Sequence, residues 1–208
     1  MSATADEVRA PIEGATGLVV ANLVTLGFAL WFDWPIATLM WPYLLQSLVI
    51  GGFAILRMLT APRICTKGMT SNGRPVPATR AGRVSTAAFF AVHYGFFHFG
   101  YALFVAHDGG WPTGTDLWAT LALVLVFAWG HANSYRGNRR VEDEVPVNLG
   151  TVMALPYLRI IPMHLTIVFG GVLAGGSTSA FALTLFVLLK TGADLGMHYA
   201  EHRVLRRG

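Results

Sequence analysis

Six apolar segments of about the length of a membrane helix divide the chain, and polar residues gather in the stretches between them. The segments are residues 17–34, 36–59, 84–107, 116–135, 152–174 and 179–203. A helix needs roughly 20 mostly apolar residues to cross a bilayer. The pattern therefore predicts an all-α integral membrane protein, a bundle of six transmembrane helices that forms a single domain over residues 1–208.

Composition favours a membrane protein over a soluble one. Apolar residues make up 54% of the chain and charged residues 12%, whereas a soluble domain has about 25% charged residues. Disorder is excluded because disordered chains are poor in apolar residues, and a disulfide scaffold is excluded because Cys65 is the only cysteine. The net charge of +4 comes from basic residues beside apolar runs, so we expect the lipid bilayer as partner and no nucleic acid.

The basic residues predict an orientation. The loop of residues 61–83 carries five Lys or Arg and no acidic residue, basic residues also follow the fourth and sixth segments, and the alternate loops have none. Lys and Arg collect on the cytoplasmic side of a bilayer. We expect a multi-pass protein of the prokaryotic cell membrane with both termini and residues 61–83 in the cytoplasm. The acidic first sixteen residues lack the basic start of a cleavable signal.

Titratable side chains are concentrated in the last four segments. Such groups are costly inside a bilayer and usually face the bundle interior. A helical rise of about 1.5 Å per residue places several of them in the cytoplasmic half of the membrane, about 5 to 15 Å from its edge. We predict that five of them converge on one inner site: His93, His131, His164, Asp194 and His198. His98 points about 140° away from His93 on the same helix and is not counted among them.

This set of residues indicates a metal site. Asp194 and His198 are four residues apart, so they share a helical face and can hold one ion. Nitrogen and oxygen ligands suit zinc or iron, although the residues do not settle which cofactor is bound. Asp194 would be a ligand or a general base, and Arg159 would hold an anionic or carbonyl group. The resulting hypothesis is a metal-dependent hydrolase that acts on a lipid-like substrate.

Other functions fit the same residues. Lys190 lies one turn before Asp194, so a simple ion pair is an equal alternative to a metal ligand at Asp194. Histidines on two helices are also typical of a haem-binding electron carrier. A transporter or a structural membrane subunit would pair its polar groups with one another. Whether the chain is an enzyme stays open at this point.

Four stretches of the chain resemble one known family. They are WPYLLQSLVIGGFAILRML, FFAVHYGFF, PYLRIIPMHLTIVFGG and LLKTGADLGMHYAEH, and they are similar to the prokaryotic membrane proteins grouped as domain of unknown function 6498. The resemblance implies a multi-span helical fold and no established activity. It marks six polar positions: His93, Arg159, His164, Lys190, Asp194 and His198. The family usually has Glu-Asn where this chain has Gln46-Ser47, which implies an altered site if that Glu holds an ion.

Overall fold

The computed structural model describes the backbone of residues 5–173 and 180–206. It leaves undescribed the side chains of residues 5–15, 17–18, 140–141, 170–173 and 197–206. The chain folds into two compact units. Unit 1 consists of residues 1–38 and 158–208, and unit 2 consists of residues 39–157. The single domain expected from the sequence stays a prediction.

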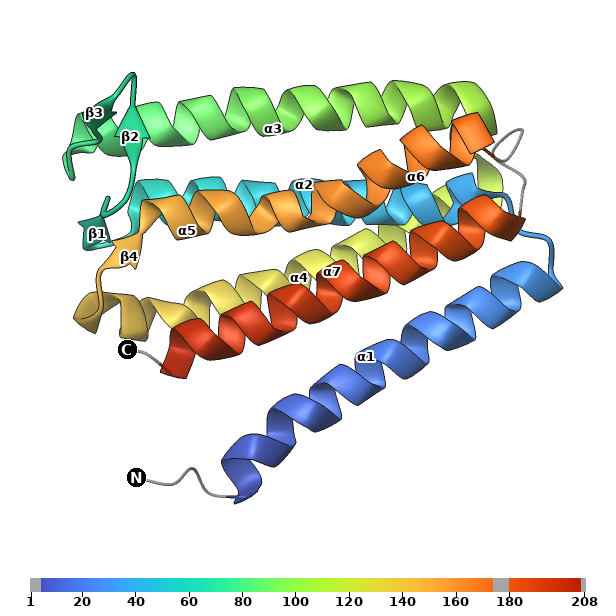
Figure 1. The fold of residues 1–208 in the computed structure, drawn as a ribbon, viewed down its shortest axis with the longest axis horizontal. Helices are drawn as coiled ribbons and strands as arrows, with labels where there is room; N and C mark the ends of the chain where they lie inside the picture. The colour runs from blue at the N-terminus through green and yellow to red at the C-terminus, as the bar shows by residue number, and fades with distance from the viewer. Residues whose placement is uncertain (1–4, 174–179, 207–208) are drawn as a thin grey trace. The chain divides into compact units, whose positions relative to one another are not determined.

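Helices account for most of the described chain (Figure 1). They are α1 (Ala5–Trp31), α2 (Ile36–Thr60), α3 (Arg80–Gly109), α4 (Gly114–Glu144), α5 (Leu149–Ala154), the short 3-10 helix η1 (Leu155–Arg159), α6 (Ile160–Leu173) and α7 (Ala180–Arg206). The long helices lie where the apolar segments predicted them. Two helices extend beyond their apolar segments, because polar residues can lengthen a helix past its apolar part: α1 begins at Ala5, before the segment of residues 17–34, and α4 continues to Glu144, beyond the segment of residues 116–135. The fifth segment is divided among α5, η1 and α6.

Among the residues that the structure describes, four stretches are long and apolar enough to cross a membrane: Ile36–Thr60, Arg80–Gly109, Gly114–Arg139 and Leu149–Phe169. They correspond to the second to fifth predicted segments, and they are typical of a multi-pass membrane protein. In the first segment the apolar helical stretch is shorter, Val19–Trp31. The last segment forms α7, which carries Lys190 and Asp194 in its middle. Six spans and their orientation therefore stay predictions.

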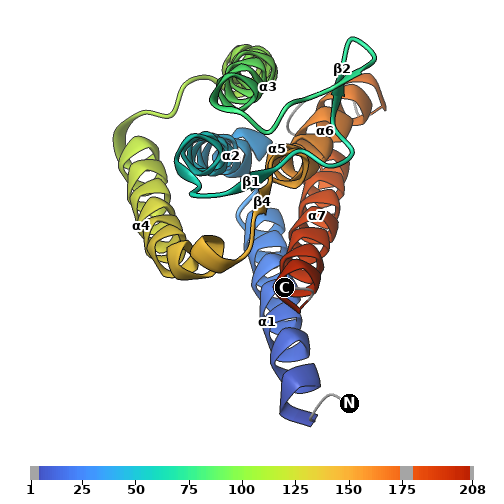
Figure 2. The same ribbon diagram turned by 90° about the vertical axis from the view of Figure 1, so that its left-hand side faces the viewer.

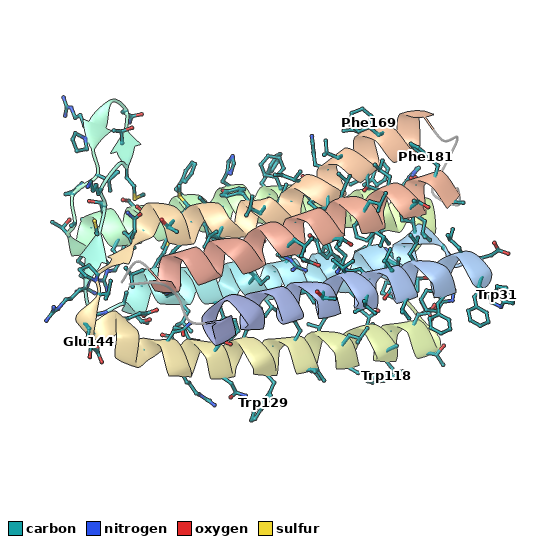
Figure 3. The ribbon with its side chains drawn as sticks, turned by 60° about the horizontal axis from the view of Figure 1, so that its bottom comes forward. Trp31, Trp118, Trp129, Glu144, Phe169 and Phe181 are labelled. Carbon is teal, nitrogen blue, oxygen red and sulfur yellow. The ribbon has the colours of Figure 1, made fainter. Side chains whose placement is uncertain are left out.

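In unit 2, α2 is the central helix. Figure 2 shows it end-on, with α3, α4 and α5 around it. Tyr43, Leu44 and Met58 of α2 are buried, as are Phe90 and Tyr94 of α3. The outer helix α4 exposes most of its apolar side chains, and Trp118 and Trp129 project away from the helices (Figure 3), with 72% and 67% of their surface exposed. Such a surface suits contact with lipid.

The connections at one end of unit 2 are ordered by short strands, where the sequence had indicated only a loop. β1 (Ile64–Cys65) pairs in parallel with β4 (Val147–Asn148), and β2 (Thr70–Ser71) forms a hairpin with β3 (Arg74–Pro75). The hairpin turn places Asn72 at φ 50° and Gly73 at φ 74°, which is the left-handed backbone that two-residue hairpin turns require. Strand pairing thus joins the α2–α3 connection to the α4–α5 connection.

Unit 1 contains α1, α6 and α7. α7 packs against both other helices, and Figure 1 shows it running antiparallel to each of them. The apolar core of unit 1 includes Met163 from α6 and Phe186 and Val187 from α7. Buried polar side chains accompany this apolar core, and they form the candidate site.

Candidate functional site

Lys190 and Asp194 form an ion pair along α7. The Nζ atom of Lys190 lies 2.7 Å from Oδ2 of Asp194, as expected for two residues one helical turn apart. The Asp194 side chain is only 10% exposed and that of Lys190 is 25% exposed. The ion-pair interpretation of these two residues is therefore confirmed.

Arg159 provides a second cation to the same carboxylate. Its Nη1 atom lies 3.2 Å from Oδ1 of Asp194, and its side chain is 5% exposed. Arg159 is the middle residue of the apolar stretch Leu149–Phe169, about 15 Å from either end at the helical rise. Both carboxylate oxygens of Asp194 thus contact cations, the buried Arg159 and the half-buried Lys190.

A proline lies one turn after Arg159. Pro162 lacks an N–H and cannot donate to the carbonyl of Leu158. The helix changes from 3-10 to α geometry in this region, since η1 ends at Arg159 and α6 begins at Ile160. Arg159 therefore stands at the junction of the two helix types.

Asn22 of α1 completes the cluster. Its Oδ1 atom accepts a hydrogen bond of 2.9 Å from Nζ of Lys190, and the residue is 9% exposed. The amide nitrogen Nδ2 is buried and has no hydrogen-bond partner among the described residues. Sequence reasoning missed this residue, although a signal existed, because Asn22 is the only amide in the first apolar segment.

We call Asn22, Arg159, Lys190 and Asp194 the ionic cluster. Among the contacts that the structure describes, two cations share one carboxylate. Buried charge is costly, and more so inside a membrane, so an anionic group near two cations is favoured over a neutral one. The ionic cluster can therefore gain stability by accepting an anion.

The histidines predicted to bind metal have separate surroundings in the parts of the structure that describe them. In unit 2, Nδ1 of His93 lies 2.8 Å from Oη of Tyr157. His131 stacks on Phe53 and contacts the Phe127 ring at a tilted angle. In unit 1, His164 is exposed. The His198 side chain lies outside the described residues.

No group of three or more His, Cys, Asp or Glu side chains that could hold a metal ion occurs among the described residues. The convergence of His93, His131, His164, Asp194 and His198 stays a prediction.

The position that departs from the family pattern has a structural role. Ser47 is fully buried, and its Oγ atom lies 2.8 Å from Oη of Tyr94. Tyr94 in turn donates a 3.0 Å hydrogen bond to the Ser47 carbonyl, and Gln46 beside it is half-buried. Ser47 thus satisfies the hydroxyl of a buried tyrosine.

Comparison with known proteins gives one match. The sequence model of a family of unknown function, DUF6498, matches residues 5–207. The chain belongs to this family. Neither a curated protein nor a solved structure matches it. The DUF6498 match covers residues of both units, but it supplies no activity.

Three of the six positions that the DUF6498 resemblance marked lie together in unit 1. Arg159, Lys190 and Asp194 form the charged part of the ionic cluster. The site chemistry of this DUF6498 protein is therefore argued from these residues.

Proposed function

We propose that this DUF6498 protein binds the acidic head group of a membrane-embedded, lipid-like ligand at the ionic cluster. The observation that supports the proposal is that two cationic side chains, Arg159 and Lys190, meet at one mostly buried site around Asp194. An acidic head group would neutralise this charge, and the apolar tail of the ligand would remain in the bilayer. A water-soluble anion without an apolar tail would bind more weakly, because it would have to leave the water that hydrates it.

Each residue of the cluster has a distinct role in such binding. Arg159 offers a planar guanidinium, which suits carboxylate and phosphate oxygens. Lys190 supplies a compact point charge, and Asn22 supplies the Nδ2 donor. Asp194 holds Arg159 and Lys190 in place through its two oxygens, so it positions the cations and does not bind the ligand itself.

The test uses two ligands that differ only in their head group. Purified full-length protein in a neutral detergent is titrated with oleate or with oleyl alcohol, and thermal unfolding is measured. Oleate should stabilise the protein, by about 2.7 kcal/mol at a concentration 100 times Kd. Oleyl alcohol should not. Acetate serves as a head group without a tail, and it should have little effect at the same concentration.

Lys190 supplies the decisive variants. Lys190→Gln removes one charge but leaves an amide that can still reach Asn22 and Asp194, so the Arg159–Asp194 pair remains neutral and intact. This variant should fold and lose the response to oleate. Lys190→Arg keeps the charge and should retain the response. Equal stabilisation by oleate and oleyl alcohol, or an undiminished response in Lys190→Gln, would show that the cluster is purely structural.

The metal-dependent hydrolase is a second candidate, and one observation favours it. The Nδ1 atom of His93 is held by Tyr157, and a group that fixes one imidazole nitrogen commonly orients the other toward a metal. Against it, both oxygens of Asp194 already contact cations, and the positive charges of Lys190 and Arg159 would disfavour a metal ion at this carboxylate. Elemental analysis of the purified protein decides between the candidates. Stoichiometric zinc or iron that is lost in His93→Ala would support the hydrolase. If no metal is bound, the anion-binding site remains as the candidate of the two.

A further inference from the structure

The end of unit 2 that carries the short strands is rich in positive charge. Residues 57–83 and 136–148 contain nine Lys or Arg and three Asp or Glu. Figure 2 looks onto this end, with β1 beside β4. These two segments, far apart in sequence, are joined by the parallel pairing of Ile64 with Val147 and of Cys65 with Asn148.

Part of this charge is used inside the protein. Arg57 donates from Nε to Oε1 of Glu142 over 2.5 Å, and Nη1 of Arg139 lies 3.9 Å from Oε2 of the same buried carboxylate. Arg83 donates to the carbonyl of Leu59 over 3.0 Å. Glu142 is therefore already neutralised and cannot serve as counter-ion for the remaining cations.

Five further basic residues face outward, and we call them the basic end: Arg63, Lys67, Arg74, Arg80 and Arg136. None of the five makes an ion pair with a residue that the structure describes. Asp143 and Glu144 are the exposed acidic residues of the same segments, and Figure 3 places Glu144 at the end of α4. The basic end therefore keeps a clear excess of positive charge.

The backbone that carries the basic end is fixed. Arg74 is paired with Ser71 across the β2–β3 hairpin. Thr79 caps α3 by accepting from the Gly82 nitrogen at 3.3 Å, and Gly82 lies so close to the carbonyl of Pro77 that a Cβ would be 2.1 Å from its oxygen. Charges on a fixed backbone lose little entropy when a ligand binds.

We infer that the basic end binds the anionic head groups of phospholipids in the adjacent leaflet. The residues flank the ends of three helices that are long and apolar enough to cross a membrane, which brings them to head-group depth. Basic residues at this depth attract anionic lipids, and each additional Lys or Arg near the membrane surface raises the affinity of a basic segment for these lipids. The inference concerns unit 2 and does not depend on the ionic cluster of unit 1.

The test measures lipid retention by full-length protein with native mass spectrometry. Phosphatidylglycerol and phosphatidylcholine with identical acyl chains are the probes. Phosphatidylglycerol should bind preferentially, and Lys67→Gln with Arg74→Gln should weaken it about fivefold per side chain removed. Raising the salt concentration should weaken binding further, since exposed charges are screened.

Two controls separate the possible sites. Lys67→Arg with Arg74→Lys conserves the charge and should retain phosphatidylglycerol. Lys190→Gln alters the ionic cluster and should leave retention at the basic end unchanged, whereas the Lys67 and Arg74 variants should leave the oleate response unchanged. An unaltered affinity for phosphatidylglycerol in Lys67→Gln with Arg74→Gln, or a loss seen only in Lys190→Gln, would overturn the inference.

Discussion

Tyr94 is a polar aromatic residue in the middle of an apolar helix, and its neighbours explain how it is accommodated. Its hydroxyl exchanges hydrogen bonds with the Ser47 side chain and carbonyl, so it is buried with its polar atom satisfied. One turn further along α2, Gly51 leaves room for the ring. A Cβ at Gly51 would lie 2.6 Å from Cε1 of Tyr94, well inside van der Waals contact.

Gly51→Ala should therefore destabilise the protein. Alanine normally stabilises a helix by about 1 kcal/mol relative to glycine, but overpacking of a buried site costs about 1 to 3 kcal/mol. Because two hydrogen bonds hold the Tyr94 ring, it cannot easily move away. Thermal unfolding in detergent should show a lower midpoint for this variant.

Gly52→Ala is the matched control, because a Cβ at Gly52 meets nothing within 4 Å. It should leave the midpoint unchanged or raise it slightly. If both variants behaved alike, the close approach of Tyr94 to Gly51 would be refuted.

The charged residues show what sequence can and cannot reveal at this scale. The pair of Lys190 and Asp194 follows from their spacing of four along one helix. Arg159 and Asn22 reach the same cluster from elements 35 and 168 residues away in sequence. Contacts of that kind depend on how each helix is rotated about its axis. These helices are apolar on most of their faces, so the sequence does not show which face points inward. The positions of the polar residues and the pairing within α7 were predictable, but the partners on other helices were not.

At the scale of elements, the end of α2 is held by its neighbours. The last carbonyls of a helix have no partner within it, and here Arg83 of α3 and Arg139 of α4 donate to Leu59 and Thr60 over 3.0 and 2.7 Å. Glu142 fixes Arg57 of α2 to the far end of α4. The continuation of α4 beyond its apolar part thus serves to fasten α2.

Glu142→Gln should loosen this attachment. A neutral amide cannot balance the charges of Arg57 and Arg139. Breaking a buried ion pair lowers the free energy of unfolding by several kcal/mol at most. The loss should be smaller here, because both arginines are about one-third exposed and water screens their charges. We expect a loss of about 1 kcal/mol in the free energy of unfolding. The neighbouring change Asp143→Asn alters an exposed residue and should have no such effect. Equal unfolding midpoints for the two variants would argue against the role assigned to Glu142.

The helices themselves were predictable because each apolar segment is long. The strands were not, because two-residue strands are too short for any alternation of polar and apolar residues to show. The pairing of β1 with β4 also joins segments more than 80 residues apart, a distance over which the sequence pattern carries no information about contact. The turn between β2 and β3 could be predicted, since Asn72-Gly73 is a strong turn signal.

At the scale of the whole molecule, the two units keep their polar groups in different places. In unit 1, Arg159 of η1 contacts Asp194 of α7, which also binds Lys190, and an amide of α1 accepts a hydrogen bond from Lys190. Unit 2 has most of its charges at one end, beyond the apolar parts of its helices. Charged residues inside a bilayer commonly mark a functional site, whereas basic residues at its edge determine the orientation of the protein in the membrane. The orientation can be tested on unit 2 alone.

α3 provides the test, because its 30 residues extend about 45 Å and its ends should lie on opposite sides of the membrane. Cysteines are introduced by Ser71→Cys, in the hairpin before α3, and by Asp108→Cys, at its far end, each in a Cys65→Ser background. A membrane-impermeant maleimide should label the Asp108→Cys variant in intact cells and the Ser71→Cys variant only after permeabilisation, because basic loops stay in the cytoplasm. The opposite pattern would invert the orientation. Labelling of both variants in intact cells would show that α3 does not cross the membrane.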